Sequence, residues 1–227
     1  MLVLCVISVL SLLSVGLAAP LSCADLLRPL KMNSTNHILG KWIFIAESTE
    51  VPGGREYAAK EWITGWLQIS PGLQNNTVKE LQMINIGGKC ISMTSEMTME
   101  NNMENNTFTS TGPLPYSQTY LNTCPDCLLV QQKLSLVSKY STLYIFSKRK
   151  ELTSAELEVF KKQVDCLNLP PAVFTKPQKD SCPDPTQDNS KTLDLSKVIE
   201  LLSDKIDLKK TLEEMISKLQ LGSNKAD

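Results

Sequence analysis

The chain has 227 residues, with 24 acidic and 23 basic side chains and a formal net charge of −1. This length suits one domain with extensions, and the balanced charge excludes the basic surface expected of a nucleic-acid-binding protein. Hydrophobic residues make up 42% of the chain and charged residues 21%, so most of it can bury a core. The single histidine, His37, leaves little material for histidine-based catalysis or a multi-histidine metal site. Composition therefore favours a binding protein over an enzyme, with no metal and no cofactor.

The N-terminus predicts the cellular compartment. Residues 1–19 form an apolar run that ends in small residues, as in a secretory signal peptide. Gly16 and Ala18 are the small residues expected before a cleavage site, so we expect cleavage after Ala18. An uncleaved membrane anchor is the alternative, but the run is short for a span of about 20 residues and lacks a charged flank. No other segment reaches spanning length, which predicts a secreted, extracellular protein with no membrane span.

The cysteines and the N-glycosylation sequences also fit a secreted protein. Six cysteines follow the signal, and in an oxidising compartment they predict three disulfides whose connectivity the spacing leaves open. Three Asn-x-Ser/Thr sequences begin at Asn33, Asn75 and Asn105 and predict surface glycosylation.

Between about residues 40 and 150, short extended segments alternate with turn signals. The candidate strands are 42–46, 66–69, 78–86, 90–99, 107–111, 117–121, 128–137 and 142–147. Eight short strands at this spacing are typical of an antiparallel sandwich or barrel.

The pattern then changes to helical. Thr153 is a plausible N-cap with Glu156 at the third helical position, and an apolar face continues until the helix ends before Pro170. Residues 171–191 are expected to form a linker, and 192–221 a second amphipathic helix. Three roles are open for this tail helix: packing on the domain wall, capping the open end, or pairing with another subunit or a lipoprotein partner.

The segment Gly40-Lys41-Trp42 opens the first strand, and one helix follows the eighth. This layout resembles that of the lipocalins. The resemblance implies a mainly β fold: an eight-stranded up-and-down antiparallel barrel with one packed C-terminal helix, plus an extra terminal amphipathic helix. Such a barrel is just wide enough to hold one small ligand; Trp42 would plug its closed end, and Gly40 would allow a tight entry turn. The expected divisions are a signal peptide at 1–18, a barrel at 19–185, and a linker with helical tail at 186–227.

Both ends of the barrel domain resemble alpha-1-acid glycoprotein (orosomucoid). The matching segments are 20–24, 33–35, 40–46, 88–91 and 165–170, with Asn105 at a family glycosylation position and Cys182 beyond the helix. The fish toxin- and tributyltin-binding proteins are the branch of that family to which the chain is similar. Two departures stand out: the Thr-Asp-Tyr signature of core lipocalins is absent, and Cys124-Pro125-Asp126-Cys127 has no counterpart in the family's two-disulfide pattern.

The resemblance implies that Cys23 pairs with Cys166 and that Cys90 pairs with Cys182, which leaves Cys124 and Cys127 as a local pair. A Cys-x-x-Cys pair forms a structural disulfide, a redox site or part of a metal site. The structural disulfide is favoured, because the pair falls between extended segments rather than at a helix N-terminus that lowers a thiol pKa. A zinc site would need two more ligands.

Strand alternation and the match to orosomucoid predict which side chains face the barrel interior. A one-residue change of register would invert any strand, and the alternative is that these side chains only fill a core. That alternative is favoured for Trp42. Few of these positions carry charge, which predicts a preference for neutral lipophilic ligands over cations. All members of this interior set except Ala46 and Ile86 are predicted ligand contacts. The set is Trp42, Phe44, Ala46, Leu67, Ile69, Gln82, Ile84, Ile86, Phe108, Val130, Gln132, Tyr144 and Phe146.

The leading interpretation is a secreted carrier that sequesters small lipophilic molecules, with Gln82, Gln132 and Tyr144 orienting the ligand. A second interpretation is an extracellular interaction or immunomodulatory protein that acts through its surface, glycans and tail helix. A third, an enzyme resembling the prostaglandin-isomerase lipocalin, needs a free cavity thiol, and six paired cysteines argue against it.

Overall fold

The computed structural model describes residues 21–32, 34–61, 64–74, 76–86, 88–100, 107–110, 116–135, 138–175, 182–184 and 192–194, together with Glu214 and Ser217. The proposed signal peptide at 1–18 lies outside these residues, as do Asn33, Asn75 and Asn105 and nearly all of the predicted tail helix.

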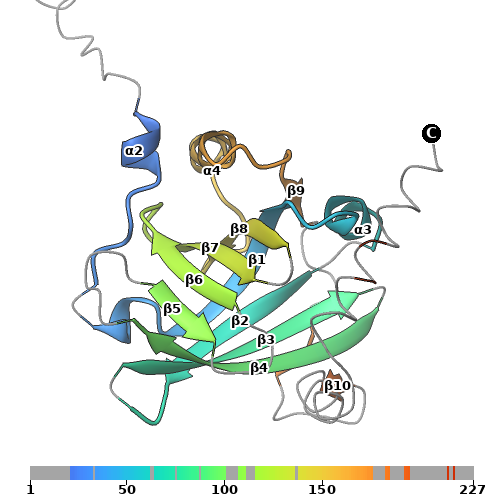
Figure 1. Ribbon diagram of the computed structural model, residues 1–227. Coiled ribbons are helices and arrows are strands. Elements are labelled where there is room, and N and C mark those ends of the chain that lie inside the picture. Colours follow the sequence, from blue (N-terminus) through green and yellow to red (C-terminus); the bar gives the residue numbers. More distant parts are fainter. Residues whose placement is uncertain are drawn as a thin grey trace, which may run out of the picture.

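An eight-stranded antiparallel barrel forms the body of the protein, which confirms the expected fold class (Figure 1). Its strands are β1 (Gly40–Thr49), β2 (Thr64–Pro71), β3 (Thr77–Ile86), β4 (Lys89–Met99), β5 (Thr107–Ser110), β6 (Tyr116–Leu121), β7 (Cys127–Ser135) and β8 (Lys139–Ser147). Each of the eight predicted strands overlaps one of these, because the alternating pattern and the turn residues are local signals.

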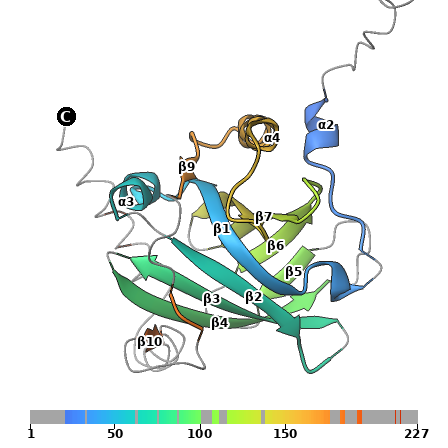
Figure 2. The same cartoon turned by 180° about the vertical axis from the view of Figure 1, so that it is seen from behind.

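The barrel closes through two pairings of different extent. Neighbours pair in chain order, β8 returns to β1, and β4 pairs with β5 only over Met97–Met99. Figures 1 and 2 show β2, β3 and β4 forming one wall and β5 to β8 the other, with β1 crossing between them.

A β-bulge in β1 corrects one prediction. Phe44 pairs with Phe146, but the next pair is Ala46 with Ile145, so Ile45 is an extra residue in the ladder with β8. The alternation therefore reverses after Phe44. Ala46, predicted to face the interior, packs in the outer core beneath the helix, and Glu47 takes the inward position.

The bulge is stabilised by a distant part of the chain. Thr175 donates its backbone N–H to Ile45 O at 2.9 Å, and its hydroxyl donates to the same oxygen at 3.0 Å. Just before it, β9 (Val173–Phe174) pairs with Ala46 and Glu47. The segment 171–191, predicted to be a linker, therefore begins by adding a short strand to β1.

Within residues 21–175, four helical elements pack around the barrel. The predicted helix is α4 (Ser154–Cys166), and Thr153 and Glu156 form the expected capping box. Phe160 and Val164 of α4 pack on the outward faces of β1, β7 and β8. The sequence did not predict α2 (Cys23–Leu26), the 3-10 turn η1 (Thr35–His37) or α3 (Gly54–Glu61).

Three disulfides join the cysteine pairs that the resemblance implied. Cys23 bonds to Cys166, Cys90 to Cys182 and Cys124 to Cys127. Beyond Cys182, β10 (Thr192–Asp194) pairs in parallel with Cys90–Ser92 of β4. The second helix was predicted to begin at 192, but this stretch is a strand, because it lies along the edge that β4 leaves open before Met97.

Trp42, predicted to plug the closed end of the barrel, is buried near the start of β1, at the end of the barrel that we call the lower end. Its indole N–H donates to Ile38 O at 2.8 Å, and the Lys148 ammonium lies 4.8 Å from the centre of its ring. Gly40 starts β1 with φ +110°, a conformation that favours glycine.

Candidate functional site

A cavity of about 160 Å³ lies in the upper part of the barrel, toward the end where β1 finishes and β2 begins. It is bounded by β1, β2, β3, β6, β7 and β8, and most of its walls are apolar. Beyond Ile43, β1 no longer pairs with β2, and the cavity walls there include Glu47 of β1 and Thr64 and Gly65 of β2. An apolar cavity with a few polar groups is typical of small-molecule sites.

The structure brings together seven of the eleven predicted ligand-contacting residues. Lining the cavity are Phe44, Leu67, Gln82, Ile84, Val130, Tyr144 and Phe146. Trp42, Ile69 and Phe108 are buried in the core but do not line the cavity, and neither does Gln132. The side chain of Ile86 lies outside the described residues. The upper barrel therefore offers ligand space, while the lower barrel is filled by the protein's own side chains.

Glu47 places a carboxyl group at the wall of this cavity. It pairs with Tyr144 across the β1–β8 ladder, and burial raises its pKa from 4.5 to about 7. The pKa of the Tyr144 hydroxyl is also raised, first by burial and then by the nearby Glu47 charge. Near neutral pH the carboxyl is thus divided between its neutral and ionised forms.

A second interior carboxyl, Glu80, lies deeper in the barrel and is fully buried. The Tyr120 hydroxyl donates to Glu80 Oε1 at 2.9 Å, and the Gln118 amide donates to Oε2 at 3.2 Å. Burial raises the pKa of Glu80 to about 7 against the opposing effect of these two hydrogen bonds. Gln118 also lines the cavity, so this network reaches from the core to the ligand space.

Sequence reasoning missed Glu47, Glu80 and the interior side chains of β6. The sequence could have predicted Glu80 as an interior residue, because it lies two residues before Gln82 and four before Ile84 on an uninterrupted strand and so points to the same face. Tyr116, Gln118 and Tyr120 alternate in the same way and are buried. Glu47 gave no such signal, because an unbroken alternation from Trp42 assigns it to the outer face.

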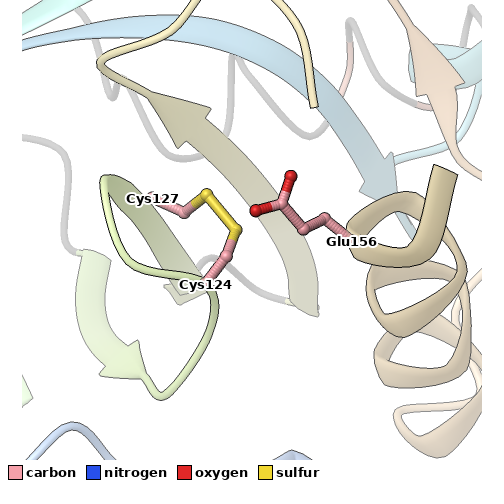
Figure 3. A group of neighbouring side chains, drawn as sticks. All are labelled: Cys124, Cys127 and Glu156. Atoms are coloured by element: carbon pink, nitrogen blue, oxygen red, sulfur yellow. A yellow bond between two sulfur atoms is a disulfide. The ribbon is translucent and has the colours of Figure 1, made fainter. Parts of the chain in front are cut away.

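The Cys124–Cys127 disulfide lies beside a charged pair, at the end of the barrel where β1 begins and β8 ends. Figure 3 shows the Glu156 carboxylate, in the first turn of α4, directed toward the disulfide. Its oxygen and the two sulfurs all lie within 4.8 Å of one another. Arg149 holds Glu156 through a 2.7 Å ion pair and lowers the pKa of that carboxyl to about 2, with Thr153 contributing.

Comparisons with known proteins identify the fold. No family model and no curated protein matches the sequence. Among solved structures, the siderocalin Ex-FABP, described as having dual ligand specificities, aligns with a TM-score of 0.57 and 12% identity over 65% of this chain and 100% of its own. The chain has the lipocalin fold. A second siderocalin, Q83, described as having a dual ligand binding mode, aligns with a TM-score of 0.57 and 15% sequence identity, over 66% of this chain and 96% of its own. A dog lipocalin allergen aligns with a TM-score of 0.53 and 12% sequence identity, over 65% of this chain and 98% of its own.

This fold sets the general expectation for the cavity. A barrel of eight strands is just wide enough to hold one small ligand. Within the described residues no helix is both long and apolar enough to cross a membrane.

Proposed function

We propose that the protein is a secreted glycoprotein carrier that binds and sequesters small lipophilic molecules in the barrel cavity. The observation that carries this proposal is the largely apolar cavity in the upper half of a lipocalin barrel. Burial of apolar ligand surface would drive binding, at roughly 25 cal/mol for each Å² removed from water.

Polar groups around the cavity would select the orientation of the ligand. Gln82, Gln118 and Tyr144 offer neutral donors and acceptors, and Glu47 adds a titratable carboxyl. The sequence-based preference for neutral ligands rested on an interior with few charges, and Glu47 and Glu80 remove that premise. We propose instead that the ligand presents a hydrogen-bond donor or a positive charge to Glu47.

Secretion and the family branch are part of the same proposal. Three disulfides are consistent with an oxidising compartment, and the apolar N-terminal run supplies the signal. The Cys23–Cys166 and Cys90–Cys182 pairs support placement near orosomucoid, whose resemblance implied them. Glycosylation at Asn33, Asn75 and Asn105 and the tail's role in self-association or lipoprotein contact are further predictions.

Displacement of a fluorescent lipophilic probe tests the cavity directly. Ile84 lies on the cavity wall, so Ile84→Trp should fill part of the space and weaken probe binding at least tenfold. Lys79→Trp is the matched control, because Lys79 is an exposed residue of the same strand; it should bind the probe like the wild type. Equal binding by Ile84→Trp and wild type would place the site outside the cavity.

Native mass spectrometry of protein from its natural source would then identify the ligand class. A stoichiometric lipophilic molecule is the expected result. An empty barrel that also binds none of a panel of steroids, fatty acids, retinoids and lipophilic amines would refute the carrier proposal and favour a surface-mediated interaction function.

A further inference from the structure

The hairpin between β6 and β7 brings three side chains with metal-binding atoms together on a partly exposed surface. Cys124 and Cys127 come from the hairpin, and Glu156 comes from α4 (Figure 3). Their two sulfurs and a carboxylate oxygen all lie within 4.8 Å of one another. The sequence supplied only the two sulfurs; the packing of α4 supplies the carboxylate.

Backbone contacts hold this turn independently of its disulfide. Cys127 donates its N–H to Cys124 O at 3.2 Å, and Lys148 donates its N–H to Asp126 O at 2.9 Å. The Ser147 hydroxyl also donates to Asp126 O, at 3.1 Å. After the S–S bond is broken, these contacts keep the two thiols close together.

The surroundings of the two sulfurs differ. Cys124 lines a groove between α2 and α4 that holds about 370 Å³, so an external thiol can approach its sulfur. Arg149 Nη2 donates to Cys127 Sγ at 3.7 Å, so its positive charge can stabilise the negative charge that develops on this sulfur when it leaves. Attack at Cys124 with departure of Cys127 as a thiolate is therefore the favoured direction.

We propose that the Cys124–Cys127 disulfide masks a binding site for a thiophilic divalent cation such as Zn²⁺, and that a small monothiol opens it. A monothiol thiolate attacks Cys124 Sγ, forms a mixed disulfide and releases the Cys127 thiolate. A second monothiol attacks the external sulfur of the mixed disulfide, leaves as the oxidised dimer and releases the Cys124 thiolate. Two monothiols are oxidised and one protein disulfide is reduced.

Both thiolates and Glu156 then bind the cation, and water completes four-coordinate geometry. Two thiolates and one carboxylate around Zn²⁺ leave a net charge of −1, which the Arg149 guanidinium neutralises. Arg149 and Thr153 already orient the Glu156 carboxylate through hydrogen bonds of 2.7 and 2.8 Å. Hydrogen bonds of this kind to a ligating carboxylate are common around protein metal sites.

Cobalt titration of the reduced protein tests the site. The purified secreted protein, from which the signal peptide has been removed, is treated anaerobically with 2-mercaptoethanol, freed of thiol and titrated with Co²⁺, followed by competition with Zn²⁺. We expect one equivalent of Co²⁺ with thiolate-to-metal charge-transfer absorption, displaced by Zn²⁺. The untreated protein, in which the sulfurs are bonded to each other, should show none.

Three variants separate this site from the other cysteines. Cys124→Ser with Cys127→Ser, reduced in parallel, leaves Cys23, Cys90, Cys166 and Cys182 and should lose the absorption. Glu156→Gln should weaken Zn²⁺ binding tenfold or more, while glutamine preserves the capping box. Glu158→Gln, an exposed glutamate of α4 that points away from the Glu156 side of the helix, is the matched control and should bind like wild type.

Equal Co²⁺ absorption in the double serine variant would overturn the site, and so would its absence from the reduced wild type. Unchanged affinity in Glu156→Gln would overturn the three-ligand assignment. Neither the cavity nor its ligand enters this test, so the carrier proposal stands or fails separately.

Discussion

Replacement of the buried Glu80 carboxyl by an amide should raise stability at neutral and alkaline pH. In Glu80→Gln the new side chain keeps the size of the original. Its oxygen can accept the Tyr120 hydroxyl, and its N–H can donate to Gln118 once that amide turns over, so the interior hydrogen bonds can form again. What the substitution removes is a negative charge in a site that water does not reach.

The size of the effect follows from the pKa of Glu80, which burial raises from 4.5 to about 7. At about 1.4 kcal/mol for each tenfold change in proton affinity, the ionised form costs on the order of 3 kcal/mol of folding free energy. Below pH 4.5 the carboxyl is protonated in both the folded and unfolded chain, and this cost is absent. As pH rises to about 7 the folded state holds a proton that the unfolded state has lost, so stability falls. Above pH 7 the cost is constant.

Urea unfolding with disulfides intact, measured at intervals from pH 4.5 to 8.5, checks this sign and size. At pH 8 the free energy of unfolding of Glu80→Gln should exceed that of wild type by about 3 kcal/mol. At pH 4.5 the two should agree to within about 1 kcal/mol, the net value of one hydrogen bond. Glu151→Gln, at an exposed position, should leave the pH profile unchanged.

A Glu80→Gln protein that is less stable than wild type at pH 8 would refute the reasoning. It would mean that the Tyr120 and Gln118 hydrogen bonds outweigh the cost of burying the charge. Equal pH profiles in Glu80→Gln and wild type would show that Glu80 does not titrate with a raised pKa.

Three further predictions concern the cavity and the disulfides. In fluorescence titrations a neutral lipophilic probe should bind more weakly at pH 8 than at pH 6, because it further desolvates a Glu47 carboxyl whose pKa is about 7. A lipophilic amine should show the opposite trend. Glu47→Gln should remove the pH dependence of binding for both probes. Replacing Cys90 and Cys182 by serine should cost about 4 kcal/mol in urea unfolding, because that disulfide closes a long loop, whereas replacing Cys124 and Cys127 should cost about 2 kcal/mol; equal losses would contradict the loop-entropy argument. Thr175→Val should lower stability by about 1 kcal/mol and reduce probe affinity, since its hydroxyl donates to the carbonyls of the β1 bulge; unchanged affinity would show that the bulge does not depend on that hydroxyl.

The sequence by itself determined the eight strands and the helix α4. Each depends on a local pattern: alternation along a strand, or a capping box at Thr153 and Glu156. The cysteine pairs followed from a resemblance in the sequence, since spacing alone left the connectivity open.

The tertiary structure alone decided which side of β1 faces the ligand beyond Phe44. The bulge at Ile45 depends on pairing with β8 and on donors from Thr175, 130 residues away in the chain. The residue pattern of β1 does not reveal such contacts. An unbroken alternation therefore assigns Glu47 to the outer face and Ala46 to the interior. The meeting of Glu80 with Tyr120, and of Glu156 with the Cys124–Cys127 pair, likewise required strands and a helix to be placed in space. Local pattern defines elements, whereas chemistry between elements depends on how they pack.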